Sequence, residues 1–221
     1  MPTSESRTVT TIPMPHGGEG LLGLPVSEPH GIVLFAHGSG SSRLSPRNAQ
    51  VAEALQEAGF ATLLFDLLTE REAADRTNVF DIGLLSERLG AAADFVARND
   101  VGRGLPLGFF GASTGAAAAL MAAATRTDVR AVVSRGGRPD LAGDSLARVK
   151  APTRLIVGSR DVEVLALNRM ACDRMRCECR LDVVPGATHL FEEPGALEAV
   201  VNLARDWFQQ HLKGRPVEVR R

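Results

Sequence analysis

The chain has 221 residues, of which 44% are hydrophobic and 23% are charged, as is typical of a globular protein. This length suits one substantial core, so we expect a single domain over residues 1–221. Lys and Arg number 25 against 26 Asp and Glu. The formal net charge of −1 excludes a general electrostatic attraction to nucleic acid or to an anionic membrane surface.

Residues 1–20 contain no apolar run flanked by basic residues, and no segment has the length and hydropathy of a membrane span. We therefore expect a soluble cytoplasmic protein, present as a monomer or a homodimer. Cys172, Cys177 and Cys179 are odd in number and have no neighbouring histidine, which argues against a disulfide framework and against a zinc site. We expect free or packed thiols and no metal.

Apolar runs alternate with helical patterns along the chain. Residues 1–30 are expected to form an N-terminal β-hairpin at one edge of a sheet, and residues 31–212 its core. Strands covered on both faces are expected at 31–36, 60–65, 106–112, 130–134, 153–158 and 180–185. Apolar residues at three- to four-residue steps predict helices at 48–59, 82–96, 114–125, 164–171 and 195–212. This alternation predicts an α/β fold, with a mostly parallel central sheet and helices on both faces.

The sequence Gly-Ala-Ser-Thr-Gly at residues 111–115 joins a predicted strand to an alanine-rich helix. In a Gly-x-Ser-x-Gly turn the serine takes a strained conformation, and glycines are needed beside it because larger side chains would collide. The hydroxyl of Ser113 is then exposed at the amino end of a helix. A helix N-cap is the alternative role for this serine.

An aspartate and a histidine follow two later strands. Asp161 comes directly after the predicted strand at 153–158, and His189 precedes the last helix. A serine needs a base to become nucleophilic, and the base needs a carboxylate to orient it. Because the carboxyl ends of parallel strands share one edge, we expect Ser113, Asp161 and His189 to form a catalytic triad.

The glycine-rich loop after the strand at 31–36 is the predicted oxyanion loop. The backbone N–H groups of Ser39 and Thr114 are expected to hold the oxyanion, and His37 is expected to shape the loop. The loop lacks the Gly-Lys-Ser/Thr and Gly-x-Gly-x-x-Gly patterns, so phosphate cradling is weakly supported.

The motifs FAHGSGSSR, FGASTGAAAAL, LIVGSRD and PGATHLFEEPG together resemble the α/β-hydrolase superfamily, and in particular the dienelactone hydrolase family. The resemblance implies an α/β-hydrolase fold with a minimal cap, Ser113 as nucleophile, Asp161 as acid and His189 as base, and no cofactor. Dienelactone hydrolases usually carry cysteine at the nucleophile position, so Ser113 favours a carboxylesterase.

We therefore expect a serine hydrolase that cleaves small or medium carboxylic esters or lactones through an acyl-enzyme. The segment of about forty residues after the second core strand is too short for a large lid but can form one wall of an open pocket. A thioesterase, an acyltransferase, a promiscuous phosphotriesterase and a non-catalytic binding protein remain alternatives.

Several arginines follow predicted strands near this edge of the sheet. Arg43 or Arg135 is expected to face the site and to favour substrates with a negative or strongly polar acyl end through a charge-assisted contact. The alternative for each is a solvated or ion-paired surface arginine.

Overall fold

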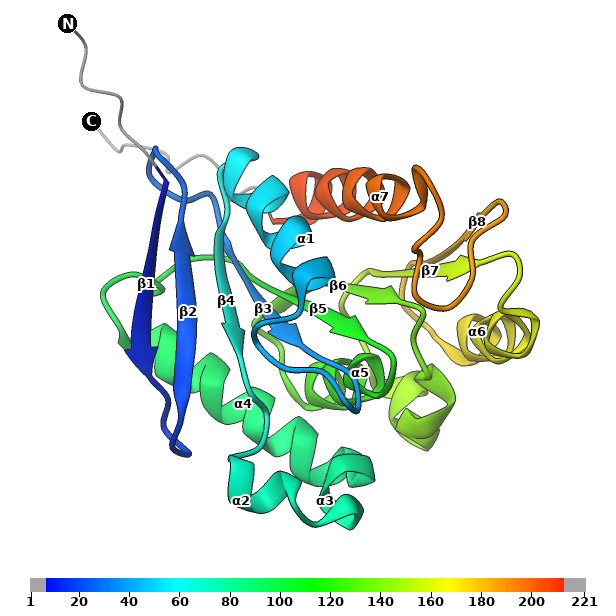
Figure 1. The fold of residues 1–221 in the computed structure, drawn as a ribbon, viewed down its shortest axis with the longest axis horizontal. Helices are drawn as coiled ribbons and strands as arrows, with labels where there is room; N and C mark the ends of the chain where they lie inside the picture. Colours follow the sequence, from blue (N-terminus) through cyan, green and yellow to red (C-terminus); the bar gives the residue numbers. More distant parts are fainter. Residues whose placement is uncertain (1–6, 213–221) are drawn as a thin grey trace, which may run out of the picture.

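The computed structural model describes residues 7–212, in which eight strands form one sheet with the order β1-β2-β4-β3-β5-β6-β7-β8 (Figure 1). β2 pairs antiparallel with β1 and with β4, and the other neighbours are parallel. The predicted mostly parallel sheet is thereby confirmed, and β1 and β2 form an antiparallel pair at one edge of it. The strands are β1 (Thr8–Pro13), β2 (Glu19–Leu24), β3 (Ile32–Ala36), β4 (Ala61–Phe65), β5 (Leu107–Ala112), β6 (Val129–Arg135), β7 (Thr153–Gly158) and β8 (Cys179–Val184).

Helices cover both faces of the sheet. They are α1 (Pro46–Glu57), α2 (Glu70–Ala73), α3 (Arg76–Phe80), α4 (Ile82–Arg98), α5 (Thr114–Thr125), the 3₁₀ segment η1 (Pro139–Arg148), α6 (Val162–Arg174) and α7 (Ala196–His211). In Figure 1, α1 and α7 lie on one face, and α4, α5 and α6 lie on the other. No helix within residues 7–212 is both long enough and apolar enough to span a membrane.

The core is divided between the two faces by the pleat of the central strands. Every residue of β5 is buried, because a parallel strand in mid-sheet has helices above and below it. Phe109 packs into the cluster beneath α4 and α5, whereas its neighbour Phe110 packs into the cluster beneath α1 and α7. Leu34 and Phe35 of β3 divide in the same way.

Two features differ from the sequence-based expectation. β8 was expected to be covered on both faces, but it is one of the two edge strands of the sheet, and Val183 is 40% exposed. The short helices α2, α3 and η1 were not predicted, because so few turns give little helical periodicity. α2 does carry a local start signal, a capping box in which Thr69 and Glu72 satisfy each other's backbone N–H.

Candidate active site

Ser113 lies in a strained turn between β5 and α5. Its backbone angles are φ 51° and ψ −123°, and Phe191 is the only other non-glycine residue with positive φ within residues 7–212. Such a conformation persists only where the surrounding structure imposes it. Here the Ser113 N–H donates to the Arg135 carbonyl at 3.3 Å, and the Ser113 carbonyl accepts from the Arg138 N–H at 3.0 Å. Ser113 stands at the N-cap position of α5, but its side chain makes no capping hydrogen bond there.

The glycines of this turn are required by close backbone contacts. A Cβ on Gly111 would collide with the Cα of Ala116, and one on Gly115 would collide with the carbonyl oxygen of Ala36. Gly38 of the β3 loop is equally constrained, because its Cβ would lie 2.8 Å from the Cβ of Ser113. The glycines thus let α5 and the β3 loop close tightly around the serine.

Asp161 and His189 are joined by a hydrogen bond. Asp161 is the N-cap residue of α6, three residues after the end of β7, and His189 lies in the loop between β8 and α7. His189 Nδ1 is 2.6 Å from Asp161 Oδ2, and the aspartate side chain is only 14% exposed. Asp161 makes no side-chain cap bond to α6. Its carboxylate is therefore available to orient the imidazole.

The loop after β3 is held against α5 and β4. The Ser39 N–H donates to Thr114 Oγ1 at 2.9 Å, which ties the loop to the first residue of α5. His37 Nδ1 donates to the Gly38 carbonyl at 3.0 Å, and its Nε2 accepts from the Leu67 N–H at 3.2 Å. Both ring nitrogens are thus used in shaping the loop, as expected for His37.

One cavity contains both Ser113 and His189. It has a volume of about 630 Å³. Its wall is formed by the β3 loop, the start of α1, the end of β6 and the loop that carries His189; the lining includes Ser39, Ser42, Pro46, Arg47, Ser113, Arg135 and His189. We call it the serine cavity.

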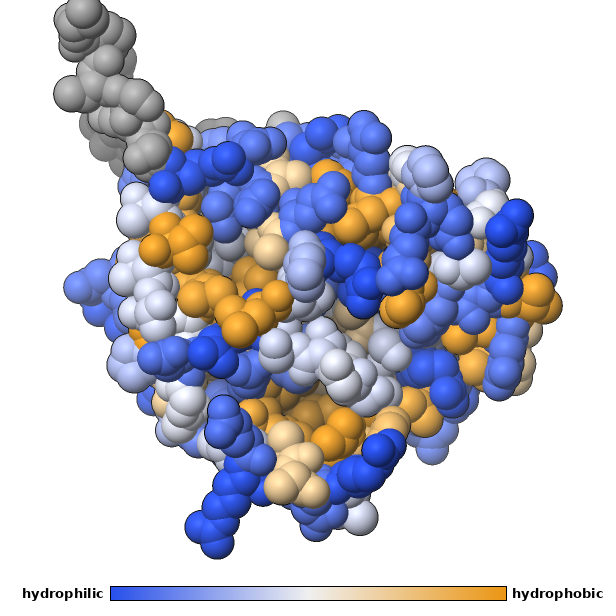
Figure 2. Space-filling view, in the orientation of Figure 1, coloured by the Kyte–Doolittle hydropathy of each residue, from blue (hydrophilic) through white to orange (hydrophobic). Residues whose placement is uncertain are grey.

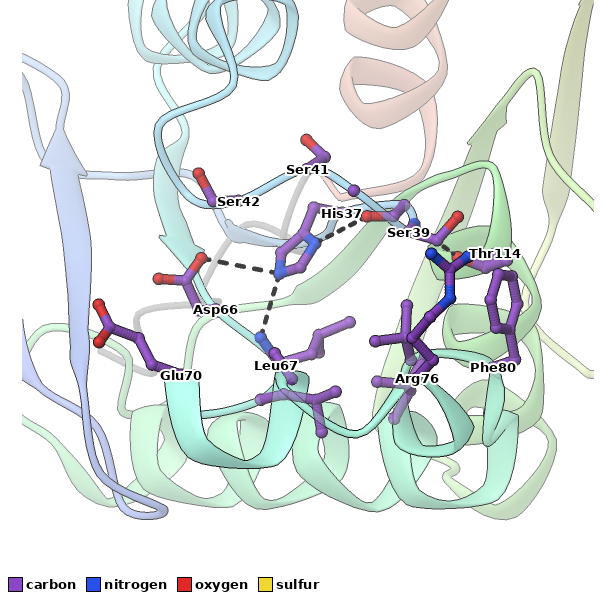
Figure 3. A pocket seen from close by; sticks show the side chains of 16 residues that line it. His37, Ser39, Ser41, Ser42, Asp66, Leu67, Glu70, Arg76, Phe80 and Thr114 are labelled. Carbon is purple, nitrogen blue, oxygen red and sulfur yellow. Dashed lines mark hydrogen bonds and ion pairs between the residues drawn. The ribbon is translucent and has the colours of Figure 1, made fainter.

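A second cavity of about 520 Å³ lies on the other side of the β3 loop. We call it the apolar hollow, since its floor consists of Leu67, Leu68, Ala73, Val79, Phe80 and Leu85. Ser39 and Thr114 border it, and Asp66, Glu70 and Arg76 stand at its polar margin (Figure 3). Figure 2 shows an orange depression in this region, above α2 and α3. The segment after β4 therefore forms one wall of a pocket, as expected.

The two predicted substrate-binding arginines have different surroundings. Arg43 does not line the serine cavity: its Nη1 lies 2.5 Å from Asp66 Oδ2 and its Nη2 3.0 Å from Glu19 Oε2. These carboxylates, Asp66 foremost, raise the pKa of Arg43. Arg135 does line the serine cavity, together with Ser113 and His189. Of the two, only Arg135 faces the candidate site.

Among residues 7–212, neither a disulfide nor a metal cluster accompanies this site. Cys172, Cys177 and Cys179 are free and partly buried, and burial raises the pKa of the Cys177 and Cys179 thiols. Within residues 7–212, no group of three or more His, Cys, Asp or Glu side chains is arranged to hold a metal ion.

Sequence reasoning missed Arg47 and the side chains of α3. Arg47 directly precedes the helix predicted at 48–59 and was not considered as a site residue, and the five-residue α3 gave no periodic signal. The one available signal was the capping box that begins α2, since it indicates ordered structure in this segment.

A serine at a strained strand-to-helix turn, on a sheet of this strand order, defines the α/β-hydrolase class. The family model described as an alpha/beta hydrolase domain matches residues 29–201, and the chain belongs to this family. It is similar to a dienelactone hydrolase from Anabaena variabilis, with 52% identity, a TM-score of 0.89 and coverage of 93% of this chain and 99% of that one. The chain is thus a dienelactone hydrolase-like α/β hydrolase.

Two further comparisons widen this picture. A dienelactone hydrolase-like promiscuous phosphotriesterase, P91 from metagenomic libraries, shares the fold at 19% identity, with a TM-score of 0.76 and coverage of 95% of this chain and 100% of that one. A curated protein of Mycobacterium tuberculosis that carries the provisional name phosphoribosyl transferase is 60% identical over 211 residues, which are 95% of this chain and 47% of that protein. The chain therefore spans about half the length of the curated relatives it matches.

Proposed function

We propose that the chain hydrolyses carboxylic esters through an acyl-enzyme on Ser113. The observation that carries the proposal is the 2.6 Å contact between His189 Nδ1 and Asp161 Oδ2, with His189 lining the same cavity as the strained Ser113. In this arrangement the Nδ1–H donates to the carboxylate, and Nε2 keeps its lone pair for the serine proton. Ser113, His189 and Asp161 then act as nucleophile, base and orienting acid.

The reaction follows from these roles. Ser113 Oγ attacks the ester carbonyl while His189 Nε2 takes its proton, and the same proton is returned to the oxygen of the departing alcohol. Water then attacks the acyl-enzyme, again with His189 as base, and releases the carboxylic acid and the free serine. No cofactor is needed for either half-reaction.

The oxyanion is assigned to two backbone donors. The Thr114 N–H stands at the first position of α5, where no intrahelical acceptor exists, and the helix dipole favours negative charge there. The Ser39 N–H donates to Thr114 Oγ1, and a carbonyl oxygen placed beside it would share or replace that hydroxyl as acceptor. The two residues are adjacent, which supports a shared role.

The transferase name of the mycobacterial relatives does not fit this half of them. We propose that it describes residues beyond the matched 47%. The β3 loop lacks the glycine patterns that cradle phosphates, and the residues described here carry the hydrolase elbow. Thioester, acyl-transfer and phosphotriester chemistry would use the same three residues, so substrate choice rests on the cavities.

A serine-directed fluorophosphonate tests the nucleophile. It should add once, and peptide mass spectrometry should place the adduct on Ser113, with the heat-unfolded protein as the unlabelled control. The protein should hydrolyse a panel of 4-nitrophenyl esters with graded acyl chains. Labelling should abolish this hydrolysis. An adduct on another residue, or a panel with no turnover, contradicts the proposal and favours a binding protein.

A further inference from the structure

The side-chain hydroxyl of Thr114 lies beside the two backbone donors proposed for the oxyanion. Its oxygen accepts a hydrogen bond from the Ser39 N–H at 2.9 Å, and the second proposed donor is the N–H of Thr114 itself. Thr114 stands at the first position of α5 and is only 5% exposed. Figure 3 shows Ser39 and Thr114 next to each other at the border of the apolar hollow. The hydroxyl is therefore a buried polar group at the proposed oxyanion site.

The proton of this hydroxyl has no acceptor within residues 7–212. A threonine hydroxyl carries one donor and two acceptor lone pairs, and the bond from Ser39 uses a lone pair. Thr125, at the other end of α5, donates its proton to the Ala122 carbonyl of the same helix at 3.0 Å. Thr114 has no helical carbonyl three residues before it, because Gly111 belongs to β5. A buried donor without an acceptor costs free energy, which an acceptor on a ligand would recover.

The β3 loop brings this hydroxyl close to the proposed nucleophile. Side chains of a helix tilt toward its N-terminus, so the side chain of its first residue extends toward the loop. The neighbouring Gly38 is tight against the serine, since a Cβ there would lie 2.8 Å from Ser113 Cβ and 3.6 Å from Ser113 Oγ. Ser39 lines both the serine cavity and the apolar hollow. A substrate oxygen that accepts from the Ser39 N–H therefore lies beside the Thr114 hydroxyl as well.

The bond from Ser39 also makes the hydroxyl a better donor. A hydroxyl that accepts one hydrogen bond donates a stronger one, because each bond polarises the next. Negative charge develops on the ester carbonyl oxygen only as Ser113 attacks, so a donor placed there acts mainly on the transition state. The alternative is that the hydroxyl only holds the β3 loop in place and contacts no substrate.

We propose that the Thr114 hydroxyl is a third oxyanion donor and thereby a further catalytic residue of this hydrolase. Its oxygen keeps the hydrogen bond from Ser39, and its proton is shared with the carbonyl oxygen of the ester as negative charge develops there. The proton stays bonded to Thr114 throughout, so no covalent bond of the threonine changes. This inference rests on the proposed ester hydrolysis at Ser113.

The first test removes the hydroxyl while keeping the shape of the side chain. Thr114→Val should lower kcat for 4-nitrophenyl butyrate about 10²- to 10³-fold, as expected when one oxyanion donor is lost. KM should stay within about three-fold of the wild-type value, because the contact forms mainly in the transition state. Thr114→Ser restores a hydroxyl at this position and should keep kcat within about ten-fold of wild type.

A second substrate separates donation to the oxyanion from support of the loop. In O-(4-nitrophenyl) thionobutyrate a sulfur replaces the carbonyl oxygen, and sulfur is a weak hydrogen-bond acceptor. Its hydrolysis should therefore depend much less on the Thr114 hydroxyl. The ratio of kcat/KM for the ester to kcat/KM for the thionoester should fall about ten-fold or more in Thr114→Val, and should be kept in Thr114→Ser.

Thr153→Val is the matched control. Thr153 is also buried, and its hydroxyl donates to the Ala151 carbonyl at 3.0 Å, at the amino end of β7 and away from the strand ends that carry the site. The loss of this hydroxyl should lower stability but leave both kcat and the ester-to-thionoester ratio at their wild-type values. Thr114→Ala, which adds no bulk, provides the same comparison if Thr114→Val does not fold.

The outcomes distinguish the inference from the function on which it rests. The inference is overturned if Thr114→Val keeps kcat within about three-fold of wild type. Equal losses for the ester and the thionoester also overturn it, because a hydroxyl that only holds the loop would affect both substrates alike. A wild-type protein that forms no acyl-enzyme with 4-nitrophenyl butyrate would instead overturn the proposed function.

Discussion

The serine cavity and the apolar hollow, on either side of the β3 loop, differ in how their charged side chains are paired. In the serine cavity Arg135 is buried and pairs with no carboxylate of residues 7–212, and it lies next to Arg47 and the start of α1. At the margin of the apolar hollow, by contrast, Asp66 is paired with Arg43, and the floor is hydrocarbon. One cavity presents a buried cation, and the other presents a hydrocarbon floor. A shared strand-end location therefore does not make two regions alike, because the neighbours of each charged side chain decide whether it is available to a ligand.

The largest effect on activity is expected when the proposed nucleophile in the serine cavity is replaced. Ser113→Ala should lower kcat by about 10⁵- to 10⁶-fold, because the acyl-enzyme can no longer form. Steady-state hydrolysis of 4-nitrophenyl butyrate measures this, and circular dichroism should show an unchanged fold. Turnover within about ten-fold of wild type would remove Ser113 from its proposed role.

A somewhat smaller effect is expected at the orienting carboxylate. Asp161→Asn should lower kcat by about 10⁴-fold, since the amide favours the wrong imidazole tautomer. Glu163, two residues further along the chain, is the alternative carboxylate. If activity survives in Asp161→Asn but is lost when Glu163→Gln is added, Glu163 orients the histidine; if it also survives in the double variant, neither does.

The apolar hollow can be filled without touching the serine cavity. Val79→Trp should reduce kcat/KM for an octanoate ester about ten-fold or more relative to the acetate ester, because the larger side chain takes the space of the distal acyl carbons. Met170→Trp, at an exposed position on α6, is the control and should leave the octanoate-to-acetate ratio unchanged. A ratio unaffected by Val79→Trp would place the acyl group elsewhere.

Titration of Arg135 should sharpen the contrast between the cavities. The pKa of Arg135, lowered by burial and by Arg47, is about 10, so the side chain is cationic below this pH and neutral above it. The anionic alcohol 3-(hydroxymethyl)benzoate serves as the inhibitor. Its inhibition constant should be independent of pH below about pH 10 and should rise about ten-fold for each pH unit above it. Inhibition constants from about pH 8 to about pH 11 measure this. The uncharged methyl ester should show no such trend, and identical trends for both inhibitors would exclude Arg135 as the cause.

The smallest effect is expected at Arg43. Arg43→Met removes a partly exposed ion pair with Asp66 and Glu19, which should lower the free energy of unfolding by only about 0.5–1 kcal/mol. Urea denaturation measures this loss, with Arg205→Met, which removes the ion pair to Asp206, as a surface comparison. The ratio of kcat/KM for an ester that carries a free carboxylate to kcat/KM for its neutral methyl-capped analogue should remain that of the wild type. A ratio that fell toward one in Arg43→Met would show that Arg43, and not Arg135, recognises the anion.

Much of the scaffold was predictable from the sequence because its signals are local. The buried strands and the long helices follow from hydrophobic periodicity, and the elbow follows from the glycines at 111 and 115, whose side-chain hydrogens leave room for Ala116 and Ala36. The order of Ser113, Asp161 and His189 predicted that the latter two would meet, since parallel strands bring their carboxyl ends to one edge. Their catalytic roles stay predictions.

The fate of each arginine was decided only by the tertiary structure. Arg43 and Arg135 both follow or end predicted strands, and nothing in their own sequence neighbourhoods separates them. The difference comes from partners remote in the chain: Asp66 and Glu19 neutralise Arg43, whereas Arg135 meets the neutral amide of Asn48. The hollow likewise depends on how two short helices pack beside the Ser39 loop. Charge compensation and cavity shape are sums over neighbours in space, so a linear pattern that determines strands and turns does not determine them.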